Sequence, residues 1–177
     1  MIKKIVTLSV ITFISLYAKP TQTTGLLAKN ITSNHQKSEK VKLGKGDIIF
    51  RSHEASGLND IIKTAKSRLG TRYVYGANRK NAVDCSSFTQ QVFKKHNKKL
   101  PRTSRSQSSV GKRIAKKDLR KGDLVFFSSR NTKHVTHVGI YISKGNFIHA
   151  SSGAHKVTIS NLSNSYYRKH YKNARRV

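Results

Sequence analysis

Hydrophobic residues repeat at helical spacing in the first half of the chain and gather into short apolar runs in the second half. The first helical repeat places apolar residues three or four positions apart, at Leu58, Ile61, Ile62, Ala65 and Leu69. Gly70 follows directly, at the position where a glycine often caps the end of a helix. The pattern therefore predicts a helix over 58–69.

A second helical stripe begins beside the only cysteine of the chain. Phe88, Val92 and Phe93 are spaced for one face of a helix that runs from Cys85 to about residue 97. Asp84 precedes this stripe, and aspartate is a favoured residue at a helix N-cap. The sequence thus predicts that Cys85 lies in the first turn of a helix.

Short apolar runs predict strands. The clearest is Leu124–Phe127, which has the length and composition of a buried strand. Weaker signals place an edge strand over Gly46–Phe50, a late strand over Val157–Ile159 and a closing strand at the basic end of the chain, Ala174–Val177. Together with the helices, these strands predict an α+β fold.

A hairpin joins the apolar run that begins at His137 to the run that begins at Asn146. The three-residue loop between them ends in glycine, which is typical of a hairpin with a bulge. If Ile142 faces Asn146, His137 and His149 become diagonal neighbours on one face of the sheet, about 7–8 Å apart at the backbone. Both imidazoles can then serve one site.

The lone cysteine permits two interpretations. A thiol in the first turn of a helix is close to unpaired backbone N–H groups, which favour the nucleophilic thiolate. With His137 as general base and His149 orienting it, Cys85 has the partners of a cysteine hydrolase. The backbone N–H of Cys85 and the Tyr73 hydroxyl would then stabilise an oxyanion. In the other interpretation Cys85 is a small buried hydrophobic residue and Tyr73 an ordinary packing aromatic.

The N-terminal region predicts export. Residues 1–18 have the positive start, apolar run and small final residue of a signal peptide. Residues 19–45 are poor in apolar side chains and predict a disordered or extended tether, which leaves 46–177 as one domain. No cysteine follows the cleavage site for a lipid anchor, so we expect a periplasmic or secreted protein without one.

The charge balance predicts attraction to polyanions. The chain has 36 Lys and Arg residues against 7 Asp and Glu, a formal net charge of +29. Outside the cytoplasm the polyanions are cell-wall polymers and acidic lipid head groups, and the dispersed charges do not indicate specific nucleic-acid recognition. No Cys/His cluster has metal-ligand spacing, and we expect neither metal nor cofactor.

Six ordered motifs together resemble the NlpC family of bacterial cell-wall cysteine peptidases. They are Tyr73-Val74-Tyr75-Gly76, Asp84-Cys85-Ser86, Leu100-Pro101-Arg102-Thr103-Ser104, Gly122-Asp123-Leu124-Val125-Phe126-Phe127, His137-Val138-Gly139-Ile140-Tyr141-Ile142 and Phe147-Ile148-His149-Ala150. The resemblance implies a papain-like domain in which the nucleophile, at a helix N-terminus, packs against a central antiparallel sheet. It also implies a peptidoglycan endopeptidase that cuts stem peptides or their crosslinks through a thioester acyl-enzyme. We expect the protein to be a monomer.

The resemblance assigns the predicted site residues. It places a Cys-His-His triad at Cys85, His137 and His149, with Tyr73 beside the oxyanion. Weaker substrate contacts fall on Asp84, Ser86 and Arg102. The chain departs from the usual pattern at Ser87 and Ala77, where the family often has glycine.

Two other functions remain open at this point. The chain has the charge of a non-catalytic wall-binding protein, and the same fold and chemistry also suit an acyltransferase. Both D-Glu to diaminopimelate and D-Ala to diaminopimelate bonds fit the predicted chemistry of an endopeptidase, because each requires the same catalytic groups.

Overall fold

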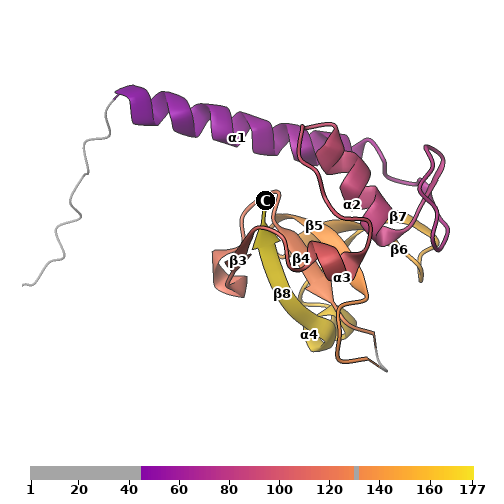
Figure 1. Ribbon diagram of the computed structural model, residues 1–177. Coiled ribbons are helices and arrows are strands. Elements are labelled where there is room, and N and C mark those ends of the chain that lie inside the picture. The colour runs from indigo at the N-terminus through magenta and orange to yellow at the C-terminus, as the bar shows by residue number, and fades with distance from the viewer. Residues whose placement is uncertain (1–44, 130–131) are drawn as a thin grey trace, which may run out of the picture. The chain divides into compact units, whose positions relative to one another are not determined.

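The computed structural model describes residues 45–129 and 132–177, and the strands of these residues form one sheet of eight strands (Figure 1). Its order is β2-β1-β7-β6-β5-β4-β8-β3. The strands are β1 Arg72–Tyr73, β2 Ala82–Val83, β3 Lys112–Ile114, β4 Leu124–Phe127, β5 His137–Ser143, β6 Asn146–Ser151, β7 Lys156–Asn161 and β8 Tyr171–Arg176. The helices are α1 Lys45–Lys66, α2 Cys85–Lys94, α3 Ser104–Gln107 and α4 Ser165–His170, with a 3-10 turn at Lys116–Asp118.

The centre of the sheet is antiparallel, as predicted. Strands β7, β6, β5, β4, β8 and β3 pair antiparallel in succession, and the short edge pair β1–β2 is parallel. The predicted closing strand is β8, which joins β4 to β3. The predicted signal peptide and tether, up to Gly44, lie outside the described residues.

Helix α1 begins earlier than the apolar repeat indicated. The prediction of an edge strand over Gly46–Phe50 is wrong, because these residues belong to α1 and pair with no described strand. A helix satisfies its backbone hydrogen bonds internally, whereas an isolated apolar triplet needs a neighbouring strand. Helix α1 ends at Lys66, and Gly70, with φ of +81°, turns the chain so that its N–H donates to the carbonyl of Val157.

The β5–β6 hairpin has a tighter turn than predicted. Ser143, rather than Ile142, faces Asn146, and the register shifts between Tyr141 and Ser143. The turn therefore contains only Lys144 and Gly145, whose φ values of +49° and +79° match the left-handed conformation that two-residue hairpin turns require. The shift leaves the far end of the hairpin in the predicted register, with Ile140 opposite Ile148.

Alternating residues of the strands fill two apolar layers. One layer joins α1 and α2 to the sheet through Ile61, Ile62, Phe88, Val92, Phe93, Phe126, Ile140 and Ile148. The other contains Ile114, Val125, Phe127, Phe147, Leu162 and Ala174. Since each large buried side chain contributes about 1.5–3 kcal/mol, the first layer fixes α2 against β5 and β6. No helix within residues 45–129 and 132–177 has the length and hydrophobicity to cross a bilayer.

Candidate active site

A cleft of about 1300 Å³ brings together most of the predicted site residues. Those that line it are Tyr73, Asp84, Cys85, Ser86, Arg102 and His137. His149 is fully buried behind the lining, on β6. The predicted residues in the cleft come from β1, from the start of α2, from the segment before α3 and from the first residue of β5, and residues of β6, β7 and α4 also line it.

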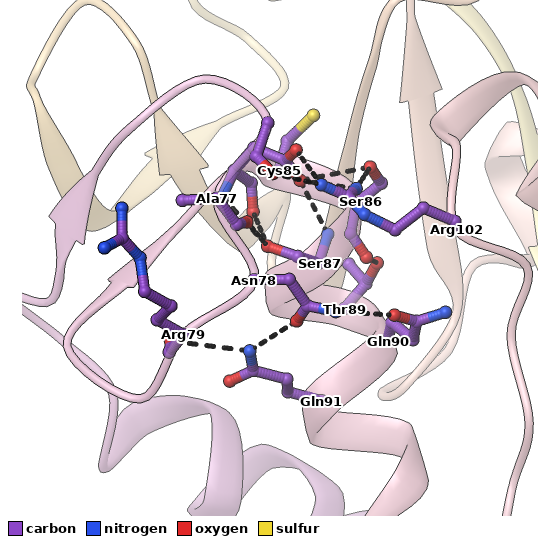
Figure 2. Close-up of polar contacts among 12 residues, drawn as sticks. Ala77, Asn78, Arg79, Cys85, Ser86, Ser87, Thr89, Gln90, Gln91 and Arg102 are labelled. Carbon is purple, nitrogen blue, oxygen red and sulfur yellow. Dashed lines mark hydrogen bonds and ion pairs between the residues drawn. The ribbon is translucent and has the colours of Figure 1, made fainter.

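Cys85 is the first residue of α2, as predicted. The Asp84 carboxylate accepts a hydrogen bond from the N–H of Ser87, and the Ser87 hydroxyl accepts one from the N–H of Asp84. This reciprocal capping box fixes where the helix begins. Cys85 keeps 8% of its residue surface exposed, and its Sγ lies 4.0 Å from the carbonyl oxygen of Thr136. Figure 2 shows the sulfur pointing away from the polar network around the cap.

The Cys85 thiol is neutral in this resting structure. Burial and, to a smaller extent, the nearby Asp84 carboxylate raise its pKa to about 11, although backbone N–H groups of Val138, Ser86 and Cys85 act in the opposite direction. The helix N-terminus thus acts on this pKa in the expected direction, but the net shift in the resting state is upward. Desolvation and a neighbouring negative charge outweigh the exposed N–H groups.

His137 and His149 form the predicted pair. Nε2 of His137 lies 2.8 Å from Nδ1 of His149, and the two rings are nearly perpendicular, at 85°. Burial lowers the pKa of His137 to about 4, and burial together with His137 lowers the pKa of His149. Both imidazoles are thus neutral near pH 7, so one nitrogen of each ring carries a proton and the other can accept one.

The far nitrogen of His149 has partners that the sequence analysis missed. Its Nε2 lies 3.0 Å from Oγ of Ser160 on β7 and 3.4 Å from the hydroxyl of Tyr167 on α4. The signal was present in part, because alternation along β7 puts Ser160 on the same face as Thr158, which is opposite His149. The pairing of β6 with β7 was needed to see it.

The predicted substrate contacts form a closed network beside the cysteine. Arg102 donates to both oxygens of Asp84, at 3.1 and 2.6 Å, and to the carbonyl of Gly76. It also donates to the hydroxyl of Ser86 (Figure 2). The Ser86 hydroxyl in turn donates to the Asp84 carboxylate. Arg102 and the hydrogen bonds from Ser87 and Ser86 hold the pKa of Asp84 below its usual value despite burial, which acts to raise it. These side chains line the cleft while holding one another.

Ser87, one of the two departures from the usual motif, is accommodated within the structure. Its side chain is fully buried, and its hydroxyl donates to the carbonyl of Ala77 at 2.7 Å. Ala77 is the other departure, and it is also buried. The hydroxyl that replaces a glycine hydrogen therefore ties the start of α2 to the preceding loop.

Tyr73 lies in the cleft, on the short strand β1. Burial, together with the Asp84 carboxylate and the charge that Cys85 carries only at strongly alkaline pH, raises the pKa of its phenol to about 12. The phenol therefore keeps its proton near neutral pH and is a hydrogen-bond donor in the cleft.

Gln107, at the end of α3, is a buried residue that the sequence analysis did not identify. Its amide donates to the carbonyls of Ser86 and Pro101 and accepts from the hydroxyl of Thr89. It thereby holds the segment that carries Arg102 against α2. No group of three or more potential metal ligands gathers within the described ranges.

The fold and the cleft define a papain-like α+β domain with a cysteine at a helix N-terminus. Comparison with known proteins makes the assignment specific, because the sequence profile of the NlpC/P60 family matches residues 70–176. The chain belongs to the NlpC/P60 family. This confirms the predicted fold and the predicted class of enzyme, a cysteine peptidase.

Individual relatives agree with this assignment. The chain is 36% identical over 157 residues to a probable endopeptidase NlpC homolog of Haemophilus influenzae, covering 88% of this chain and 80% of the relative. It is 41% identical over 109 residues to the murein DD-endopeptidase MepS/murein LD-carboxypeptidase of Escherichia coli, a Spr-type enzyme, covering 61% of this chain and 56% of that one. The crystal structure of an NlpC/P60 family protein from Bacillus cereus superposes with a TM-score of 0.64 at 38% identity, covering 67% of this chain and 39% of that chain.

Proposed function

We propose that this protein is an exported peptidoglycan endopeptidase that cleaves an amide bond of stem peptides or their crosslinks through Cys85, His137 and His149. The observation that carries the proposal is the 2.8 Å contact between Nε2 of His137 and Nδ1 of His149, with His137 and Cys85 lining one cleft. Because Nε2 of His137 is engaged by His149, its Nδ1 is left to exchange a proton with the thiol.

The reaction begins from a neutral thiol and a neutral imidazole. As Sγ of Cys85 attacks the carbonyl carbon, the thiol proton moves to Nδ1 of His137, and the carbonyl oxygen becomes an oxyanion. The backbone N–H of Cys85 and the phenol of Tyr73 are the donors for this oxyanion. Each such donor is worth roughly 3–4 kcal/mol in other hydrolases.

Collapse of the tetrahedral intermediate breaks the carbon–nitrogen bond. The imidazolium of His137 gives its proton to the departing amine, which leaves a thioester on Cys85 and a neutral imidazole. Water then attacks the thioester and loses a proton to His137, which returns it to the thiol as the carboxylic acid leaves. His149 orients the His137 ring and supports its transient positive charge.

Two further observations support the choice of substrate and compartment. The E. coli relative is named for its action on murein, and the positive charge of this chain favours attraction to the anionic polymers and lipid head groups that surround murein. We place the protein in the periplasm, with secretion from the cell as the alternative. Proteinase accessibility in intact cells and in spheroplasts distinguishes the two.

Digestion of purified sacculi, followed by mass spectrometry of the released fragments, tests the activity. Cys85→Ala and His137→Ala should each abolish fragment release while circular dichroism and the unfolding midpoint stay close to wild type. His96→Ala is a matched control, because its ring bonds Thr64 and lines a different pocket. Undiminished cleavage by either cleft variant would refute the assigned roles, and the fragment masses identify the bond cut.

A further inference from the structure

Behind the two histidines, the structure holds a hydroxyl whose role goes beyond the triad. His149 is fully buried, and each of its ring nitrogens has a close polar neighbour: Nε2 of His137 at 2.8 Å on one side and Oγ of Ser160 at 3.0 Å on the other. The chain of contacts runs from β5 through β6 to β7. Three neighbouring strands thus contribute one side chain each to a continuous line of polar groups.

The proton positions along this line are linked. If Nδ1 of His137 is free to accept the thiol proton, its Nε2 must carry a hydrogen, which it donates to Nδ1 of His149. His149 must then carry its own hydrogen on Nε2, and that N–H needs an acceptor. Ser160 supplies the oxygen at the shorter distance.

We propose that Ser160 is a positioning residue that selects the reactive tautomer of His137 through His149. The proposal rests on the proposed function, because tautomer selection matters only if His137 acts as the base. Ser160 accepts from Nε2–H of His149 and directs its own hydrogen toward the Tyr167 phenol, which faces Ser160 and Ser151. A hydroxyl can accept and donate at once, and Ser160 has a partner for each role.

Removing the Ser160 hydroxyl reverses the preference. The nearest remaining partner of His149 Nε2 is then the Tyr167 hydroxyl at 3.4 Å, which can donate its hydrogen to that nitrogen. His149 would carry its proton on Nδ1 and donate to Nε2 of His137, and His137 would hold a hydrogen on Nδ1. In that arrangement His137 cannot accept the thiol proton at the nitrogen that serves Cys85.

The kinetic test compares three serine variants on a soluble muropeptide identified from the sacculus digest. Ser160→Ala should lower kcat about tenfold with KM within twofold of wild type, because the Ser160 hydroxyl lines the cleft but is engaged by His149. Ser160→Thr keeps the hydroxyl and suits a strand, so it should restore kcat to within about threefold of wild type. Ser163→Ala, an exposed serine just beyond β7, is the matched control and should behave as wild type.

The spectroscopic test reads the tautomer directly. In long-range ¹H–¹⁵N spectra of the ¹⁵N-labelled full chain near pH 7, assigned with His137→Gln and His149→Gln, both rings should show a protonated Nε2 and an unprotonated Nδ1. Ser160→Ala should shift both rings toward a protonated Nδ1, and Ser160→Thr should not. A wild-type His137 protonated on Nδ1, or a Ser160→Ala variant with unchanged spectra and wild-type kcat, would overturn the inference.

Failure of the proposed function has a different signature. Wild-type protein would then release nothing from sacculi, whatever the state of its histidines. An active wild type together with an equally active Ser160→Ala would leave the function standing and remove Ser160 from it.

Discussion

The ion pair between Arg102 and Asp84, beside Cys85, allows two substitutions that should both lower stability but change the reactivity of the thiol in opposite directions. Asp84 raises the pKa of the Cys85 thiol, and Arg102 binds Asp84 through two nitrogens. Asp84→Asn removes the negative charge and frees the positive one, so the thiol pKa should fall. Arg102→Met does the opposite, because it leaves the Asp84 charge without its cationic partner and the thiol pKa should rise.

Both variants should nevertheless lose stability. Asparagine keeps an oxygen for the N–H of Ser87 and is itself a good N-cap, but its NH₂ replaces the oxygen that Arg102 approaches at 2.6 Å. Because the Arg102 side chain is 39% exposed, we discount the lost pair to about 1–2 kcal/mol. Arg102→Met leaves the buried Asp84 carboxylate with only neutral donors, which should cost about 2–3 kcal/mol. Urea unfolding at pH 7 measures both.

Alkylation by iodoacetamide measures the thiol. Only the thiolate reacts, so at pH 8 each unit of change in a pKa that lies above the pH changes the rate about tenfold. The wild-type rate should keep rising well beyond pH 9, since the thiol pKa is raised to about 11. Asp84→Asn should react about three to ten times faster than wild type, and Arg102→Met correspondingly slower. If both variants reacted faster, local opening of the cleft would govern the rate, and the electrostatic reasoning would be wrong.

Two further predictions concern the fold around the histidines. Acidification from pH 7 to pH 4 should destabilise the protein by up to about 3 kcal/mol through His137, whose folded-state pKa of about 4 lies below the ordinary value of 6.5, so that the unfolded chain binds the proton first. Urea unfolding at the two pH values measures this loss, which should be smaller in His137→Gln; an equal loss there would assign the effect to other groups. Gly139→Ala should cost about 1–3 kcal/mol, because the new methyl group would lie 2.6 Å from the Phe147 ring and 3.1 Å from the Ile148 carbonyl oxygen. The midpoint of thermal unfolding measures this cost. Gly57→Ala is the control, because a methyl group at this position of helix α1 meets open space and alanine should stabilise the protein by about 0.5–1 kcal/mol. Equal shifts of the midpoint in both variants would contradict the close approach at Gly139.

The parts of the site that could be predicted from sequence obey local rules. Asp84 caps the helix because a carboxylate reaches an N–H three residues ahead, a relation contained in a few consecutive residues. His137 and His149 meet because a short hairpin fixes which residues are diagonal neighbours. The predicted length of the turn was wrong, but the predicted register at Ile140 was right, because the bulge near Ser143 accommodates the extra residue.

The parts that could not be predicted depend on distant segments. Ser160 reaches His149 only after β7 pairs with β6, and Gln107 is buried only because α3 folds back onto α2. Likewise, the apolar triplet within Gly46–Phe50 has the composition of a strand. It is helical because no described strand pairs with it, which the sequence alone does not show. The spacing of apolar residues along the chain does not indicate which distant segments contact one another.

The ionisation of Cys85 shows most clearly where reasoning from sequence ends. A helix N-terminus favours the thiolate, but the sign of the net effect depends on how much water the fold removes from the sulfur and on the carboxylate next to it. The same burial disfavours a lone charge on His137. It also strengthens the attraction between a thiolate and an imidazolium once both exist. We therefore expect the proton to cross from Cys85 to His137 only as a substrate carbonyl reaches the sulfur, which keeps the resting thiol unreactive toward other electrophiles.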